Sequence, residues 1–411
     1  MNKPLSHIRV LDLTRVLAGP WCTQNLADLG AEVIKVERPG AGDETRGWGP
    51  PWMPVEAGQE RQDSTYYAST NRGKKSVTVD FATSEGQEIV RRMAATCDVL
   101  VENYKVGTLA RFGLSYEDLR AANPGLIYCS VTGYGQTGPY RHRPGYDFVF
   151  QGMSGLMSLT GEPDDACGEC EGGGPQKFGV AVADMTTGLY ASLAITAALA
   201  WRERSGLGQH IDMALLDCAL ALGSNQAVGY LASGKVPRRY GNAHPNAVPY
   251  QVFATQDGKL IVAVGNDGLF TSYCEAIGRP DLAADARFAK VSGRLVNRDA
   301  LLPLLADIMR ADTTAAWRAR LEAAGVPCGP INDFAQAFDD PQVRHRGIRV
   351  DLPLSTGGTC PAIASPMRFS ATPLDCQSGP PVLGEHTEAV LGDSLGMAPE
   401  DLIRLRAAGV I

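Results

Sequence analysis

Short apolar runs alternate with helical patterns along the first half of the chain. Each run has the length and the β-branched content of a buried strand, and clusters of polar residues, Gly or Pro separate the runs from the helical patterns. Strands that are separated by helices are typical of a mostly parallel, open sheet. We therefore predict an α/β fold with strands at 8–14, 31–37, 75–81, 98–103 and 126–132 and with helices at 20–30, 84–97 and 115–124.

The pattern changes in the second half. Residues 250–264 alternate like a β-hairpin with its turn at Asp257-Gly258, and helical stretches follow, one of them ending at Gly325. From the pattern alone, the tail either adds to the first domain or forms a third unit. The predicted limits are a large domain at 1–200, a linker helix at 201–225, a smaller α/β domain at 226–330, and the tail at 331–411.

The longest nearly apolar run, "FGVAVADMTTGLYASLAITAALAW" at 178–201, contains one carboxylate, Asp184. The run begins like a strand and continues as a helix to about Arg204, so Asp184 stands at a strand-to-helix junction. One interpretation is a helix N-cap, a common role for Asp, and the helix N-terminus would then help to keep the carboxylate ionised. The other is a covalent nucleophile, because small neighbouring residues leave room for a substrate. The residues alone do not decide between the two.

Composition narrows the function classes. The 411 residues are enough for two or three domains, and the net charge of −7, from 45 acidic and 38 basic residues, argues against a nucleic-acid binder. The start of the chain lacks the apolar core of a signal peptide, and the run at 178–201 is too rich in small residues for a bilayer span. The ten cysteines lack regular spacing, and we interpret Cys167 and Cys170 as part of a loop. We expect a cytoplasmic protein with no nucleic-acid or membrane partner.

Sequence motifs of several enzyme classes are missing. "GYGQTG" at 133–138 matches the dinucleotide fingerprint, but Pro139 follows it where that site needs a helix, so we interpret it as a turn. The chain contains no GxxxxGK[ST], HExxH or GxSxG sequence. We therefore expect neither a bound metal nor a nicotinamide cofactor.

Basic residues gather in the first third of the chain. Arg38 and Asn103 each follow a predicted strand, and a parallel sheet binds its ligand beyond the carboxyl ends of its strands. Arg also matches the geometry of phosphate. The alternative is an ordinary solvated surface. Besides Arg38, this basic set comprises Lys35, Arg46, Arg72, Lys74, Lys75 and Arg111.

Several stretches together resemble the class III CoA-transferase family, which includes formyl-CoA:oxalate transferases. They span nearly the whole chain in order, from "LDLTRVLAGP" and "GAEVIKVERPGAGDETR" through "DVLVENYKVGTLARFGL" and "ADMTTGLYA" to "LGEHTEAVL". The versions "TRVLAGP" and "AVPYQVF" are similar to the branch that uses succinyl-CoA and dicarboxylates, including glutarate. The resemblance implies an open, mostly parallel Rossmann-like sheet and an interlocked homodimer whose large domain uses both chain ends.

The resemblance also implies a chemistry. Asp184 stands at the position of the family's nucleophile, which attacks an acyl-CoA to give an aspartyl anhydride and then an aspartyl-CoA thioester. The CoA thioester is a co-substrate, and no cofactor is bound permanently. The positions implied for CoA binding are Leu17, Ala18, Arg38, Val79, Asp80, Asn103, Tyr104 and Arg111, and those implied for the substrate are Arg15, Tyr146, Asp147 and His244.

Two departures from family patterns bear on the substrate. Leu17 replaces the glutamine of formyl-CoA transferases, and Tyr146 replaces the histidine that racemases of this fold use as a second acid/base. We therefore predict a CoA-transferase that takes CoA from succinyl-CoA to a small dicarboxylate. Arg15, Arg46 and Arg143 are the candidates for the distal carboxylate. The alternatives are a 2-methylacyl-CoA racemase and a non-catalytic acyl-CoA-binding protein.

Overall fold

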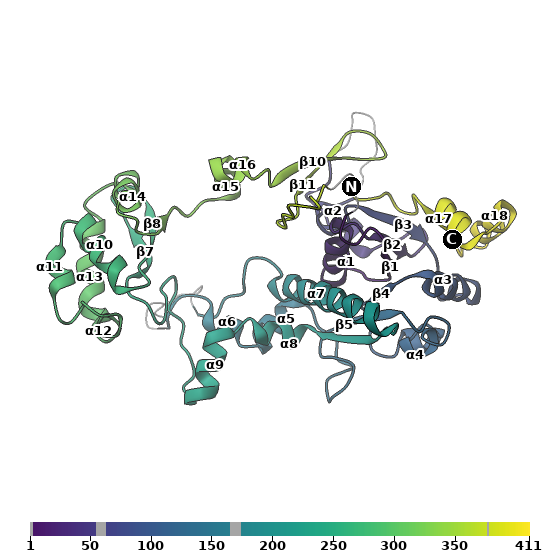
Figure 1. Cartoon of the computed structure of the whole chain (residues 1–411), viewed down its shortest axis with the longest axis horizontal. Coiled ribbons are helices and arrows are strands. Elements are labelled where there is room, and N and C mark those ends of the chain that lie inside the picture. The colour runs from purple at the N-terminus through teal and green to yellow at the C-terminus, as the bar shows by residue number, and fades with distance from the viewer. Residues whose placement is uncertain (1–2, 55–62, 165–173, 376–377) are drawn as a thin grey trace. The chain divides into compact units, whose positions relative to one another are not determined.

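The computed structural model describes residues 3–54, 63–164, 174–375 and 378–411. The chain forms two compact units (Figure 1). The first comprises residues 1–156, 177–235 and 344–411, and the second comprises 157–176 and 236–343. Cys167 and Cys170 lie outside the described residues. Apart from the linker helix, the domain limits given above stay predictions.

A six-stranded parallel sheet forms the centre of the first unit. Its strand order, β3-β2-β1-β4-β5-β6, is that of a Rossmann-like sheet, so the predicted parallel α/β architecture is confirmed. The last strand, however, falls within the range predicted as a linker helix, and that prediction is wrong for these residues because they pair with β5. The strands are Arg9–Asp12 (β1), Glu32–Glu37 (β2), Lys74–Thr78 (β3), Val99–Glu102 (β4), Ile127–Thr132 (β5) and His210–Ala214 (β6).

Helices cover both faces of this sheet, and each face has its own apolar core. On one face, alternate strand residues such as Val10 and Val99 pack against α1 (Ala18–Asp28), α7 (Val182–Ser205) and α8 (Leu215–Ala221). On the other, Leu11 and Leu100 pack against α3 (Ser84–Thr96), α17 (Thr387–Leu395) and α18 (Pro399–Ala407). The alternation follows from the two-residue period of a strand, whose successive side chains point to opposite faces.

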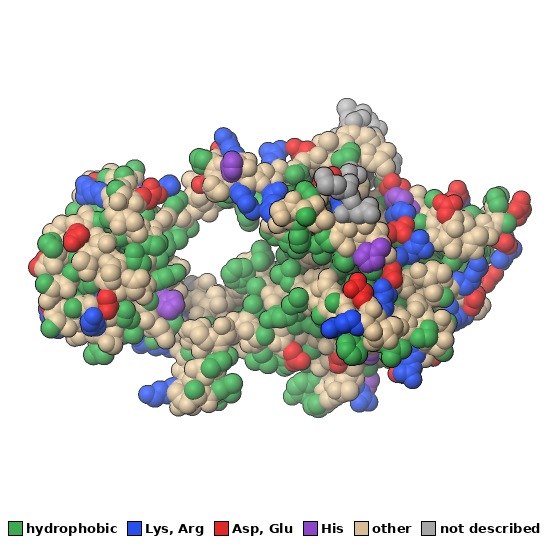
Figure 2. Space-filling view, viewed as in Figure 1, with side chains coloured by type: hydrophobic (Ala, Val, Ile, Leu, Met, Phe, Trp, Pro, Cys, Tyr) green, Lys and Arg blue, Asp and Glu red, His purple; other side chains and the backbone are tan. Residues whose placement is uncertain are grey.

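Helix α7 is long and apolar enough by composition to cross a membrane, but its contacts are those of a core helix. Its buried positions, Ala183 to Leu199, form a stripe that packs on the sheet and on α1. At Gly188 the approach is so close that a Cβ would lie 2.6 Å from the carbonyl oxygen of Ala18. Leu189 and Leu193 remain exposed, and Figure 2 shows hydrophobic side chains among the surface atoms of this region.

The second unit contains the predicted hairpin. Strands β7 (Tyr250–Ala254) and β8 (Lys259–Ala263) pair antiparallel, and β9 (Cys328–Gly329) adds to β8. The apolar side of this small sheet packs against α10 (Asp267–Ala276), α13 (Arg298–Met309) and α14 (Thr314–Ala323). Helix α14 begins after Thr313, whose hydroxyl accepts from Ala316 N.

The remaining elements are short. In the first unit, β10 (Arg349–Pro353) and β11 (Thr359–Ile363) form an antiparallel hairpin. The others are η1 (Glu44–Gly47), α2 (Thr65–Thr70), η2 (Leu109–Phe112), α4 (Tyr116–Leu119), α5 (Asp147–Met153), α6 (Leu156–Leu159), α9 (Ser224–Ser233), α11 (Pro280–Ala284), α12 (Val291–Val296), α15 (Phe334–Asp339) and α16 (Pro341–His345). The "GYGQTG" stretch is a turn, in which Gly135 and Gly138 have positive φ.

Candidate active site

Asp184 lies in the first turn of α7 and is not its N-cap. The cap position belongs to Ala181, which has no side-chain acceptor, and the residues before it do not form a strand. The expected strand-to-helix junction is therefore wrong. The strand beside β5 is β6, and residues 178–181 pair with none of the described strands. Among the described residues, no donor is hydrogen-bonded to the carboxylate of Asp184, which is partly buried.

The first N–H groups of α7 are capped from another helix. Asp147 on α5 accepts from Ala183 N (2.7 Å) and from Asp184 N (3.2 Å) through Oδ1. Its Oδ2 accepts from Gln151 Nε2 at 2.6 Å, and Gln151 Oε1 accepts from Phe178 N at 2.8 Å. Asp147, expected as a substrate contact, is thus engaged in holding the start of α7.

Burial and the charge of Asp147 together raise the pKa of Asp184 to about 7. This is opposite to the expectation that the helix N-terminus keeps Asp184 ionised, because loss of hydration and a neighbouring like charge outweigh the helix dipole. Burial, Asp184 and Asp147 also raise the pKa of Tyr66 on α2 to about 12. A carboxyl group that titrates near neutrality therefore lies within electrostatic range of a phenol that stays protonated there.

Asp184 opens into a cavity of about 330 Å³ that lies wholly within the first unit. Its walls come from the loops after β1, β4 and β5 and from the start of α1, so they lie beyond the carboxyl ends of parallel strands. Lys105, Arg141 and His142 also line it, although no motif in the sequence marks them as site residues. The predicted residues that the cavity does bring together with Asp184 are Arg15, Leu17, Ala18, Asn103, Tyr104, Arg143 and Tyr146.

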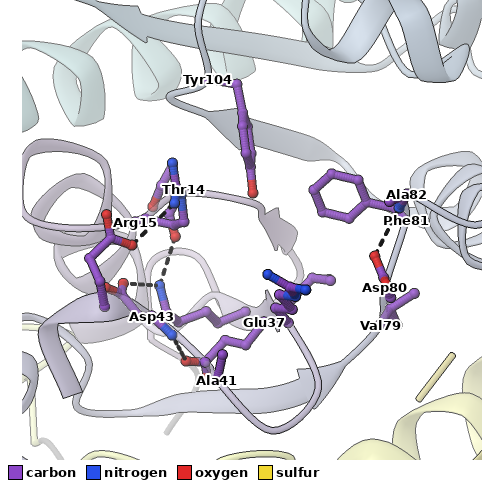
Figure 3. Close-up of a pocket in the computed structure, with 15 residues that line it drawn as sticks. Thr14, Arg15, Glu37, Ala41, Asp43, Val79, Asp80, Phe81, Ala82 and Tyr104 are labelled. Carbon is purple, nitrogen blue, oxygen red and sulfur yellow. Dashed lines mark hydrogen bonds and ion pairs between the residues drawn. The ribbon is translucent and has the colours of Figure 1, made fainter. Parts of the chain in front are cut away.

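A second, larger cavity of about 610 Å³ is lined by Arg38, Val79 and Asp80 (Figure 3). Asp80 Oδ1 accepts from Ala82 N at 3.0 Å, and the ring of Tyr104 points into the same space in Figure 3. Arg15 and Tyr104 line both cavities, so the two share a wall. Arg111 is exposed on η2 and does not line either one.

Most of the basic set is engaged in ion pairs and is not available for phosphate. Each of the four buried members is paired with a buried carboxylate, because a buried charge needs a partner. Arg38 is the exposed member that lines the larger cavity. The pairs are Lys35–Asp43 (3.0 Å), Arg46–Glu37 (2.7 Å), Arg72–Asp28 (2.6 Å), Lys74–Asp12 (3.0 Å) and the half-exposed Lys75–Glu32 (2.6 Å).

His244 lies in the second unit. Its Nδ1 accepts from Asn246 N at 3.0 Å, its main-chain oxygen accepts from Arg298 Nη2 at 2.6 Å, and its ring contacts that of Tyr250. These contacts fix the loop before β7. Its expected part in substrate binding stays a prediction.

Known proteins resemble this chain over its full length. It matches the sequence model of CoA-transferase family III over residues 5–387. It is 50% identical over 395 residues to succinate–glutarate CoA-transferase from Agrobacterium fabrum, which covers 95% of each chain. Succinyl-CoA:glutarate CoA-transferase from Mus musculus is 44% identical over 409 residues, covering 100% of this chain and 90% of the mouse protein. A solved CAIB/BAIF family protein from Brucella suis is 50% identical with a TM-score of 0.83, covering 96% of this chain and 100% of that one.

Proposed function

Because the chain belongs to CoA-transferase family III, we propose that it moves CoA from succinyl-CoA to a small dicarboxylate such as glutarate, with Asp184 as the nucleophile. The observation that carries this proposal is the free carboxylate of Asp184 in its cavity. Its neighbours Arg15 and Tyr104 also line the larger cavity, where Arg38 offers a phosphate ligand. The names of the relatives support the choice of donor and acceptor.

The proposed reaction keeps the thioester energy in covalent intermediates. The Asp184 carboxylate attacks the carbonyl carbon of succinyl-CoA, and the C–S bond breaks to give a mixed anhydride and CoA thiolate. The thiolate attacks the Asp184 carbonyl and releases succinate, which leaves an aspartyl-CoA thioester. The acceptor carboxylate attacks this thioester, and the expelled thiolate then attacks the acceptor's acyl carbon. This last step releases the new acyl-CoA and regenerates Asp184, so no outside energy source is needed.

The protonation state of the site suits this chemistry. Only ionised Asp184 attacks, and a pKa of about 7, raised by burial and by Asp147, leaves roughly half of it ionised at neutral pH. A carboxylate of higher pKa is also a better nucleophile than an ordinary one. Tyr66 keeps its proton at this pH and adds no negative charge to those of Asp184 and Asp147.

The contacts of the three candidate arginines support one of them as the ligand of the acceptor's distal carboxylate. Arg46 is buried against Glu37, and Arg15 is bonded to Glu44 at 3.2 Å. Arg143 lines the Asp184 cavity, is exposed, and stacks on the ring of Tyr140 at 3.7 Å. In the described part of the chain it has no carboxylate partner. We therefore propose that Arg143 binds the distal carboxylate of the acceptor.

A labelling experiment tests the nucleophile. The protein is incubated with succinyl-CoA and quenched, and its peptides are weighed for an acyl or CoA adduct. We expect an adduct on the Asp184 peptide, none with Asp184→Asn, and wild-type labelling with Asp217→Asn, an exposed acid in the first turn of α8. Full turnover by Asp184→Asn without any adduct would refute the mechanism.

A second experiment tests the acceptor site. Arg143→Met should raise KM for glutarate by about tenfold to a hundredfold, since a charge-assisted bond contributes about 1.5–3 kcal/mol. The same substitution should leave KM for a monocarboxylate acceptor of the same chain length unchanged. Arg120→Met, at an exposed arginine paired with Glu117, serves as the control. Equal losses with both acceptors would show that Arg143 does not bind the distal carboxylate.

Exposed apolar side chains support the proposed homodimer. Helix α9 has no buried residue, and α5 and α7 each expose large apolar side chains. A second copy of the chain is the occupant that the family resemblance implies, and light scattering in solution tests it. The exposed residues are Val149, Met153, Leu189, Leu193, Val228 and Leu231.

One observation keeps the racemase as a second candidate. His142 lines the Asp184 cavity, and its Nε2 accepts from Arg141 Nε at 3.0 Å, so a second proton-transfer group is present there. Racemisation predicts deuterium uptake from D₂O at the α-carbon of a 2-methylacyl-CoA, and a transferase predicts none. This exchange measurement separates the two activities.

A further inference from the structure

The loop between β1 and α1 contains a backbone conformation that is rare for its residue type. Val16 has φ of 70°, in the left-handed region, where a β-branched side chain meets its own backbone. Among the described residues, Ser224 is the other residue besides glycine with positive φ. A strained residue of this kind persists only where its surroundings hold it, and such residues concentrate at functional sites.

The surroundings of Val16 hold the backbone on both sides. Asn103 forms two bonds with Arg15, accepting from its N at 2.9 Å and donating Nδ2–H to its O at 2.6 Å. The N–H of Val16 itself faces both carboxylate oxygens of Asp43, at 3.4 and 3.3 Å. Lys35 Nζ donates to Thr14 O at 2.7 Å and to Asp43 Oδ2 at 3.0 Å.

The pair of Lys35 and Asp43 is fully buried, with neither side chain exposed. Burial alone disfavours both charges, but Asp43 and its neighbouring carboxylates outweigh it and raise the pKa of Lys35. Lys35 and Thr45 likewise outweigh burial and lower the pKa of Asp43. Both groups therefore stay charged across neutral pH, and their bonds to the loop persist. Figure 3 shows Thr14 and Asp43 on the same side of the larger cavity.

This loop is the shared wall of the two cavities. Thr14 and Arg15 line the larger one, and Arg15 to Ala18 line the one that holds Asp184. The loop packs tightly against the start of α1, since a Cβ at Gly19 would lie 2.4 Å from the side chain of Thr14. Ala18 then meets Gly188, on the same helix as Asp184.

We propose that Asn103, Asp43 and Lys35 are positioning residues that hold Val16 in its left-handed conformation. They thereby fix the Arg15–Ala18 wall, along which the acyl thioester reaches Asp184. The acyl thioester in this inference rests on the proposed function, whereas the contacts that hold Val16 do not depend on it. Misplacing a reacting group by about 1 Å costs about a hundredfold in rate, so a loop that relaxes here should slow the attack on the thioester.

The test uses glycine at position 16, because glycine adopts positive φ without steric strain. We compare the effect of Asn103→Ala in three backgrounds: wild type, Val16→Gly and Ser224→Gly. In the wild-type and Ser224→Gly backgrounds we expect about tenfold to a hundredfold slower adduct formation on Asp184. In the Val16→Gly background, Asn103→Ala should slow adduct formation by less than about threefold. Asp43→Asn, a nearly isosteric change, should show the same dependence on the background.

A loss that Val16→Gly does not reduce would overturn the inference, because it would mean that Asn103 acts through direct contact with CoA. Melting temperatures give a readout that is independent of catalysis. The positioning role predicts that Asn103→Ala and Val16→Gly are coupled in stability, whereas Asn103→Ala and Ser224→Gly are additive. If the wild-type protein forms no adduct, the proposed function fails while the stability coupling still decides this inference.

Discussion

Replacing Asp184 by Asn should abolish transfer and yet stabilise the folded chain above neutral pH. Burial and Asp147 raise the pKa of Asp184 to about 7 from an ordinary value of 3.8. Because the folded state disfavours the ionised form, the wild-type chain loses stability as pH rises from about 4 to about 7. Asn carries no charge and avoids this penalty.

The size of the effect follows from the shift. One pKa unit corresponds to about 1.4 kcal/mol, so roughly three units correspond to about 4 kcal/mol above pH 7. Asp184 is only partly buried, and solvent screening reduces this by about half, to about 2 kcal/mol. We therefore expect Asp184→Asn to melt a few degrees above wild type at pH 8.

The assay is calorimetric melting of both proteins at pH 5 and pH 8. The advantage of Asp184→Asn should be larger at pH 8, where wild-type Asp184 is ionised, than at pH 5. Asp217→Asn, also in the first turn of a helix but exposed, should change the melting temperature little at either pH. If the advantage of Asp184→Asn is no larger at pH 8 than at pH 5, the surroundings of Asp184 do not raise its pKa, and its carboxylate is no more basic than an ordinary one.

Two further predictions concern the contacts of α7. Asp147→Asn keeps an acceptor for the helix but removes the like charge, so the pH at which adduct formation is half-maximal should fall below that of wild type. A pH profile of Asp184 labelling measures this shift, and an unchanged profile would contradict it. Gly188→Ala places a methyl group 2.6 Å from Ala18 O and should lower both the melting temperature and the labelling rate. Gly229→Ala, where a Cβ meets nothing within 4 Å, should do neither.

The sequence was sufficient to predict five of the six strands of the central sheet and the hairpin of the second unit. The five strands are short apolar runs rich in β-branched residues, and the hairpin alternates around a turn, so both are visible as local patterns in the sequence. The family resemblance, which rests on ordered motifs, is confirmed by the match over residues 5–387. Strand β6 was missed because its apolar side chains are few and partly exposed at the edge of the sheet.

The buried cations could not be predicted in the same way. From the sequence alone, Lys35 and Lys74 are expected at the surface, because a lysine is rarely buried without an ion-pair partner. The partner of Lys74, Asp12, lies 62 residues away in the chain, so only the parallel pairing of the strands brings the two together. The same holds for Asn103, which lies 88 residues from the Arg15 backbone that it binds.

The sequence allowed two roles for Asp184, helix cap and nucleophile, and in the structure Asp147 has the capping role. A carboxylate that caps a helix accepts N–H bonds, which stabilise its charge and make it a weaker nucleophile. In this chain Asp147 accepts those bonds, from Ala183 N and Asp184 N. The Asp184 carboxylate is left facing a cavity without a hydrogen bond to any described residue, and the charge of Asp147 raises its pKa further. Capping by a distant residue therefore leaves Asp184 free and basic, and no pattern within 178–201 contains that information.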